Sequence, residues 1–307
     1  MDLYYTDVLW AQWRHYEPNL MEDIYSKILS KLKGQNPNKK LHFLDIGAGS
    51  LPLLHTLPKI ANKLLRNDQC LLYHALDFAY KQEHGKATQM LELAKKNIEI
   101  FKNSILKNDS YPQYKIDLKY LDITQAELKI DSYPKAFLGH TRGMFQHIPK
   151  KKLKVALKNY AQLTKFALII EPEWSTFKIQ VNNQDLATNL GNDANRYLKI
   201  TDILENASQK FPKTQNRQLI QSLKDNIAEF FKLIEIYPSH CKIELKYEER
   251  LVRDFYLNLI IENASNPDND ISLDEIDRDF WINSNTRLKK IDILFDHIGF
   301  FGQSKFN

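Results

Sequence analysis

Apolar residues recur every three or four positions over residues 18–33, with Leu20 and Ile24 on one stripe, which predicts an amphipathic helix. Beyond a break at residues 34–38, short apolar runs alternate with helical patterns. The predicted strands cover residues 41–46, 70–76, 116–121, 135–138 and 166–170, and the predicted helices cover residues 52–66, 86–106 and 150–163. Strands and helices in this alternation are typical of βαβ units and a parallel sheet.

The pattern changes from about residue 174, where strands become sparse. A stripe that includes Leu219, Leu223 and Phe231 predicts a helix over residues 215–236, after another at 193–208. An extended run follows at 242–250, and a stripe at 288–298 predicts a last helix, with a strand from about residue 300. We therefore expect an α/β fold in four parts. These are an N-terminal helical segment (1–40), a doubly wound, mostly parallel core (41–174), a mostly helical insertion or cap (175–285), and a final helix with an edge strand of the core (286–307).

Composition narrows the class of protein without naming a partner. The chain has 307 residues, 43% of them apolar, which suffices for one large core or two modest ones and excludes a disordered tail. Lys and Arg number 43 against 38 Asp and Glu, so the formal net charge is +5. This excess is too mild to indicate a nucleic-acid-binding surface, and we expect no nucleic-acid partner.

Cysteine usage and hydropathy predict the environment of the protein. The two cysteines, Cys70 and Cys241, form no CxxC pair, which argues against a disulfide framework or a structural zinc site. Residues 268–279 are rich in acidic side chains, but Leu273 stands where a calcium loop needs glycine, so we expect no metal. No apolar stretch approaches the about 18 residues that span a bilayer. We therefore predict a soluble, cytoplasmic protein without a membrane partner.

The clearest chemical signal is a glycine pair between the first predicted strand and the following helix. The strand at residues 41–46 includes Asp45 and runs into Gly47, Ala48 and Gly49. Glycine adopts backbone angles closed to other residues, and a helix N-terminus supplies free N–H groups. This turn therefore predicts a nucleotide-like ligand lying directly on the main chain.

Carboxylates follow the next two predicted strands. Asp77 and Phe78 end the second strand, and Asp122 and Ile123 follow the third. A carboxylate at the end of the second strand can accept hydrogen bonds from ribose hydroxyls. Asp77 lies further from the glycines than the about 20 residues usual for such a carboxylate, so we expect an extended first helix or return loop.

In their order and spacing these motifs resemble class I S-adenosylmethionine-dependent methyltransferases, whose first motif reads apolar-apolar-Asp/Glu-x-Gly-x-Gly-x-Gly. Leu51 replaces the third glycine. The resemblance covers residues 41–173 and implies a Rossmann-like fold with S-adenosylmethionine as cofactor. It places Asp45 and the glycine turn against the methionine part, Asp77 at the ribose, and Asp122 beside the adenine. A missing third glycine favours this cofactor over a dinucleotide, because that glycine normally serves packing beside a pyrophosphate.

The segment after the fourth predicted strand carries candidate acceptor-side residues. It contains His140, Arg142 and His147, at the edge where open parallel sheets bind ligands. We expect His140 to contact cofactor or substrate and Arg142 to clamp a carboxylate or phosphate. His147 is a candidate general base, or alternatively it caps or packs the helix after Pro149. Residues 137–145 are distantly similar to histidine N-methyltransferases, which implies an amino-acid substrate as one alternative.

Two further candidates end the fifth predicted strand. Glu171 and Glu173 can bind a substrate amine or act as a base, and Trp174 can stack on a cationic methyl group. The alternative is that they are ordinary exposed carboxylates at a strand end. We expect the substrate to lie between the 139–147 loop and the 175–285 insertion, on the side of the sheet away from the cofactor.

These expectations combine into one predicted activity, the transfer of a methyl group from S-adenosylmethionine to an N, O or S atom of a small molecule. Such transfer requires the acceptor to be aligned with the sulfonium and water to be excluded, which a helical insertion suits. An aromatic segment at residues 4–16 resembles segments that fold over the cofactor, or else packs on the sheet edge. Two alternatives remain: a cofactor-binding or regulatory module without catalysis, and an RNA or protein methyltransferase.

Overall fold

The computed structural model describes residues 17–83, 86–105, 114–210, 216–264 and 273–306, so the aromatic segment at 4–16 lies outside the described residues. Contacts divide the chain into two compact units. We call the first the core unit, which consists of Met21–Glu171, Leu219–Pro238 and Ile298–Asn307. The second unit contains Pro172–Gln218 and Ser239–His297, together with the residues before Met21. The predicted division at residues 40, 174 and 285 stays a prediction.

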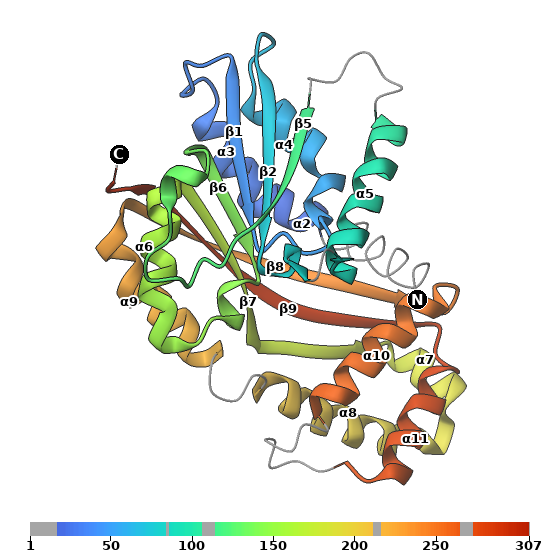
Figure 1. Cartoon of the computed structure of the whole chain (residues 1–307). Helices are drawn as coiled ribbons and strands as arrows, with labels where there is room; N and C mark the ends of the chain where they lie inside the picture. Colours follow the sequence, from blue (N-terminus) through green and yellow to red (C-terminus); the bar gives the residue numbers. More distant parts are fainter. Residues whose placement is uncertain (1–16, 84–85, 106–113, 211–215, 265–272, 307) are drawn as a thin grey trace. The chain divides into compact units, whose positions relative to one another are not determined.

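A seven-stranded sheet in the order β5-β2-β1-β6-β7-β9-β8 organises the fold (Figure 1). Its strands are β1 (Lys40–Ile46), β2 (Cys70–Asp77), β5 (Tyr114–Tyr120), β6 (Ala136–Arg142), β7 (Thr164–Val181), β8 (Phe231–Lys246) and β9 (Lys290–Ser304). Parallel pairing joins β5, β2, β1, β6 and β7 in succession. This pairing confirms the predicted α/β fold with a mostly parallel sheet. Strands β7, β8 and β9 each contain residues of both units.

Helices and helical turns connect the strands of the core unit. The predicted first helix is confirmed as a continuous run of α2 (Glu17–Leu20), the π-helical η1 (Met21–Tyr25) and α3 (Ser26–Leu32). The remainder are η2 (Pro52–His55), α4 (Leu57–Leu64), η3 (Phe78–Tyr80), α5 (Gln89–Ile105), η4 (Ile130–Ser132), η5 (Phe145–His147), η6 (Lys150–Lys152), α6 (Leu153–Leu163) and α9 (Asn216–Phe230). Gln82–Glu83 (β3) and Lys86–Ala87 (β4) pair antiparallel as a second small sheet.

The two faces of the sheet are covered by different helices, as neighbouring residues of β6 show. A Cβ at Gly139 would lie 2.8 Å from Cε2 of Tyr160, so α6 packs directly on that face. The next residue, His140, points the other way and its ring hydrogen-bonds to Tyr25 of the N-terminal helical run. Successive strand residues alternate between faces, so α6 and the N-terminal helices lie on opposite sides.

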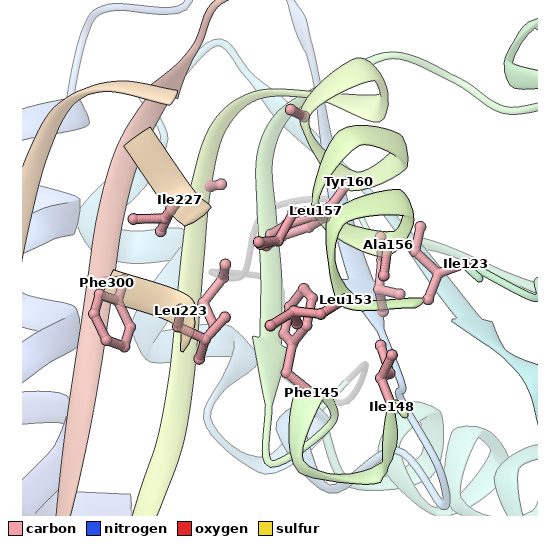
Figure 2. Close-up of a cluster of buried hydrophobic side chains, with 14 of the residues drawn as sticks. Ile123, Phe145, Ile148, Leu153, Ala156, Leu157, Tyr160, Leu223, Ile227 and Phe300 are labelled. Atoms are coloured by element: carbon pink, nitrogen blue, oxygen red, sulfur yellow. The ribbon is translucent and has the colours of Figure 1, made fainter. Parts of the chain in front are cut away.

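A cluster of buried apolar side chains lies on the α6 face. Figure 2 shows Leu153, Leu157 and Tyr160 of α6 together with Phe145 and with Leu223 of α9. All five side chains are buried. The predicted helix over residues 150–163 is therefore confirmed, and the lysines at its start are exposed. Burial of this kind supplies most of the driving force for folding.

Two predicted helical stretches are wrong. Residues 231–236 belong to β8, and residues 288–298 are mostly in β9. In β9 both faces are buried, since Ile291, Asp292 and Ile293 are all shielded from solvent. A strand buried on both faces has a nearly continuous apolar sequence, in which apolar positions three or four residues apart occur by coincidence. Enrichment in β-branched and aromatic residues is the signal that favours a strand there.

The second unit is built from α7 (Asn183–Asn189), η7 (Gly191–Asp193), α8 (Ala194–Lys210), α10 (Arg250–Ala264) and α11 (Glu275–Asn285), with parts of three strands. Tyr197 and Trp281 stack with ring centroids 6.1 Å apart. The buried guanidinium of Arg253 donates to the carbonyls of Leu288 and Asn285, which holds the chain where α11 ends. Over the described residues, every helix is too short or too polar to cross a bilayer.

Candidate functional site

The carboxyl ends of the parallel strands collect the predicted site residues at one edge of the core unit. Asp45 and His140 are directly paired across β1 and β6, and Arg142 is paired with Ile170 of β7. Asp77 is the last residue of β2. Parallel strands end at the same edge, so these residues lie at one edge of the sheet. The functional roles of these residues stay predictions.

The glycine turn has the conformation that its sequence requires. Gly47 and Gly49 adopt φ angles of +74° and +52°, and Leu51 also has a positive φ of 66°. Asp77 braces this turn: its Oδ2 accepts from the amide of Gly49 at 2.8 Å, and its Oδ1 accepts from the amide of Ala79 at 2.7 Å. Gly49 and Asp77 are 28 positions apart in the sequence, and the Asp77 carboxylate reaches back to the glycine turn.

The surroundings of this turn fit a ligand with a ribose and a flat ring. Among the described residues, no atom lies within 4 Å of a Cβ built on Gly49, so a ligand can approach the main chain there. Asp77 is half-buried, and each of its oxygens retains acceptor capacity beyond its backbone contact. The Phe78 side chain is 63% exposed, with its ring 5.8 Å from that of Tyr120. An exposed aromatic beside a carboxylate is a suitable surface for an adenosine group.

Other residues predicted around the cofactor have structural partners. Asp122 accepts hydrogen bonds from the amide and the hydroxyl of Thr124, which closes the turn after β5. Ile123 belongs to the apolar cluster on the α6 face, and its carbonyl accepts from Asn159. Ala48 is buried. Asp122 keeps its second oxygen for other contacts, whereas the side chain of Ile123 contributes to packing.

Asp45 and His140 lie in a buried network rather than on an open wall. His140 Nδ1 is 3.0 Å from Asp45 Oδ1, and its Nε2 is 2.7 Å from the hydroxyl of Tyr25. Tyr73 donates its hydroxyl to the other oxygen of Asp45. Asp45 is 4% exposed and His140 is 3% exposed. Burial and the charge of Asp45 hold the pKa of Tyr73 well above its usual range, so this phenol remains a donor.

Glu171 is fully buried, on the face of the sheet opposite His140. His140 is in register with Leu168, and alternation along β7 turns Glu171 toward the α6 face. Its Oε1 accepts from the amide of Phe145 at 2.9 Å and its Oε2 from the amide of Gln146 at 3.3 Å. Burial raises the pKa of Glu171 to about 8, although these backbone bonds act in the opposite direction. The structure therefore places this carboxyl inside the protein, bonded to the loop after β6.

The loop after β6 presents the remaining candidates of the core unit. Gly143 has a φ of +62° and donates its amide to the carbonyl of Ile170 at 2.8 Å. Arg142 ends β6 and is half-buried, and His147 closes the helical turn η5. Burial lowers the pKa of His147, so its imidazole is neutral over a wider pH range than usual.

Glu173 and Trp174 belong to the second unit and are described within it. Both are half-buried. The indole of Trp174 stacks on Phe295 with ring centroids 5.3 Å apart and an interplanar angle of 12°. Glu171 and Glu173 therefore fall on either side of the boundary between the units, and their joint action on a substrate stays a prediction.

Sequence reasoning missed several residues that shape the glycine turn. The hydroxyl of Tyr80 donates to the carbonyl of Gly49 at 2.6 Å, and the amide of Asn97 donates to the carbonyl of Ser50 at 2.6 Å. Met144 packs against Gly47. Tyr80 follows Asp77 by three residues, so a helical turn after β2 would have indicated it, whereas Asn97 and Met144 give no local signal. Among the described residues, no three metal-ligating side chains gather into a site.

Comparison with known proteins gives structural similarity without sequence similarity. No protein-family model matches the chain, and no curated protein matches it. The phosphoethanolamine N-methyltransferase 2 of Haemonchus contortus in complex with S-adenosyl-L-methionine has a TM-score of 0.42 at 13% identity, with 99% of this chain and 57% of that chain covered. The chain thus spans a little over half the length of that enzyme.

Two other solved structures have similar scores. The YcgJ protein of Bacillus subtilis has a TM-score of 0.42 at 11% identity, and the match covers 91% of this chain and 97% of that chain. The small RNA methyltransferase HEN1 has a TM-score of 0.42 at 12% identity, with 94% of this chain and 26% of that chain covered. Because these identities are low, the mostly parallel α/β fold rests on the strand order and pairing of this chain itself.

Proposed function

We propose that this chain is a class I S-adenosylmethionine-dependent methyltransferase that acts on a small molecule. The observation that carries the proposal is the glycine turn between β1 and η2, which Asp77 braces from the end of β2. An α-carbon open to a ligand at Gly49 lies beside this brace, and Phe78 exposes an aromatic ring directly after it. This combination suits a nucleoside whose attached chain lies on the backbone of the turn.

Each part of the proposed cofactor has a counterpart in the core unit. Asp77 accepts from the ribose hydroxyls with its remaining lone pairs, and Phe78 stacks on the adenine, with Asp122 at its edge. Asp45 is buried, so it acts on the ammonium group of the cofactor's methionine part by electrostatic attraction over a distance rather than by direct contact. When bound, S-adenosylmethionine supplies a methyl group on a positively charged sulfur.

The acceptor side of the proposal uses the end of β6 in the core unit. Arg142 holds an anionic group of the substrate with its planar guanidinium. His147 takes a proton from the acceptor atom at a ring nitrogen, because burial lowers its pKa and keeps the imidazole neutral. Glu173 and Trp174 belong to the second unit, and their roles at a substrate stay predictions. In this proposal Glu171 and His140 act on neighbouring residues rather than on the substrate.

Calorimetry with S-adenosylmethionine and S-adenosylhomocysteine tests the proposal directly. We expect the wild-type chain to bind both, and absence of binding at high micromolar concentration overturns the proposal. Binding without methylated product from any panel of small amines, acids and thiols favours the regulatory module instead. A steep dependence of RNA binding on salt favours an RNA substrate.

Asp77→Asn is the matched test of the cofactor position. Asn is neutral and has a single acceptor oxygen. Both backbone donors therefore lose a charged acceptor, and the one that faces the NH2 group loses its acceptor altogether, so the turn is braced less firmly. We expect affinity for S-adenosylhomocysteine to fall at least about tenfold, or ~1.4 kcal/mol. Asp68→Asn is the control, since the Asp68 side chain is 61% exposed and forms a surface ion pair with Arg66. Equal affinity of the two variants would contradict the ribose position.

A further inference from the structure

The loop that follows β6 lies directly on the glycine turn. A Cβ built on Gly47 would lie 2.5 Å from Cγ of Met144 and 2.8 Å from its Cβ. The Met144 side chain therefore occupies the space that any side chain at Gly47 would need. Gly47 is required for two reasons, its φ of +74° and this close approach. The position of Met144 thus determines how the proposed cofactor turn is packed from one side.

A single carboxyl group holds this loop from inside the protein. Glu171 accepts from the amides of Phe145 and Gln146, and the amide of Met144 also interacts with it. These amides begin the helical turn η5, where the first N–H groups have no acceptor within the turn. Since Glu171 is 0% exposed, water does not replace it as their acceptor.

Two further contacts hold the residues on either side of Met144. The Gly143 amide donates to the carbonyl of Ile170, the residue before Glu171, at 2.8 Å. The Phe145 ring packs edge-on against Tyr160 of α6, with centroids 6.2 Å apart, within the apolar cluster shown in Figure 2. Met144 lies between these anchors. The loop is thus held on both sides of Met144, and the amides that follow Met144 are bonded to Glu171.

We propose that Glu171 is a positioning residue for the cofactor: its carboxyl group fixes the 143–147 loop so that Met144 packs on Gly47 and holds the glycine turn in its binding conformation. The connection runs from the carboxyl oxygens to the backbone amides, from there to the Met144 side chain, and from Met144 to the turn. Glu171 does not contact the ligand. This inference rests on the proposed function, because it assigns the glycine turn to the cofactor.

The test is a double-mutant cycle on the affinity for S-adenosylhomocysteine, measured by calorimetry. Glu171→Ala removes the acceptor for every amide of the turn, and we expect affinity to fall about tenfold. Glu171→Gln keeps one acceptor oxygen and is expected to restore affinity to within about threefold of wild type. Met144→Ala is expected to match Glu171→Ala, and the double variant to be no weaker than either, because both act through one contact.

Glu205→Ala is the matched control. Glu205 also accepts from a backbone amide, that of Ile179, but it lies in the second unit. The proposal is overturned if the double variant loses the sum of the two single-variant losses in binding free energy. It is also overturned if Glu171→Ala and Met144→Ala bind S-adenosylhomocysteine as tightly as the control does. If Glu171→Ala does not fold, Glu171→Gln takes its place in the cycle, with an expected loss of affinity of about threefold. The double variant of Glu171→Gln and Met144→Ala is then expected to bind no more weakly than Met144→Ala alone.

Hydrogen exchange separates this inference from the proposed function. In the absence of ligand, Glu171→Ala is expected to speed exchange of the Phe145 and Gln146 amides at least about tenfold, with little change in amides of the β1–β2 pairing. If the wild-type chain binds neither S-adenosylmethionine nor S-adenosylhomocysteine, the proposed function is overturned. The exchange rates of the Phe145 and Gln146 amides are measured without ligand, so they still test the contact between Glu171 and the loop. Unchanged exchange at Phe145 and Gln146 overturns the positioning role whatever the ligand.

Discussion

Replacing Glu171 by Gln changes how the stability of the protein depends on pH. Burial raises the pKa of this carboxyl to about 8 in the folded chain, from 4.5 in the absence of such an environment. Between these two values the unfolded chain releases the proton and the folded chain keeps it. The stabilising contribution is therefore complete below about pH 4.5 and is lost as the pH rises through about 8.

The size of the effect follows from the two pKa values. A difference of about 3.5 between about 8 and 4.5, at about 1.36 kcal/mol for each pH unit, gives about 5 kcal/mol over the whole range. Between about pH 5 and about pH 9 the expected loss is about 4 kcal/mol. This is large against the 5–15 kcal/mol, roughly, that stabilises a folded domain. Gln carries no titrating proton, so the variant lacks this loss.

The assay is urea denaturation of wild type and Glu171→Gln at a series of pH values. Other groups titrate equally in both proteins, so the difference between the two free energies of unfolding isolates Glu171. That difference should move in favour of the variant by about 4 kcal/mol from about pH 5 to about pH 9. Glu229→Gln is the control, because Glu229 forms a half-exposed ion pair with Lys154 and should change the profile by less than about 1 kcal/mol. Parallel profiles for wild type and Glu171→Gln would refute the reasoning and mean that the carboxyl is ionised throughout.

Two further substitutions test the packing of the core unit. Gly47→Ala should lower the free energy of unfolding, measured by urea denaturation, by at least about 1 kcal/mol more than Gly49→Ala does. Both substitutions strain a backbone with a positive φ, but only Gly47→Ala also brings a Cβ into close contact with Met144. Equal losses for the two variants would contradict this packing. Tyr25→Phe should lower the free energy of unfolding by about 1–3 kcal/mol, because it leaves Nε2 of the buried His140 without the hydroxyl that it contacts. A change below about 0.5 kcal/mol would show that this hydrogen bond does not stabilise the fold.

The local pattern of the sequence was sufficient for the first half of the fold. Strands β1, β2, β5, β6 and β7 alternate with helices, and glycine, proline and polar residues mark the boundaries of these elements in the sequence. The position of Asp77 at the end of a strand that neighbours the glycine turn followed from the same units, because parallel strands place their carboxyl ends together. The brace between Asp77 and Gly49 is the atomic detail that this arrangement permits.

Local pattern identified only parts of strands β8 and β9, namely the extended run from residue 242 and the strand from about residue 300. In β9 apolar residues lie on both faces because both faces are buried, and burial is a property of the neighbours rather than of the strand. The helical spacing in residues 231–236 and 288–298 is real but has no consequence once these segments join the sheet. Tertiary contacts override a local preference where the energy of burial exceeds it.

The roles of individual site residues divide in the same way. The sequence alone determined that Asp45, Asp77, His140 and Glu171 stand at one edge of a parallel sheet, since that depends only on strand order and polarity. Only the tertiary structure decided that His140 faces Tyr25, 115 residues away, and that Glu171 turns inward to the backbone of the β6 loop. A carboxyl or imidazole takes its chemical role from the groups within hydrogen-bond distance, and folding brings those groups from distant parts of the chain.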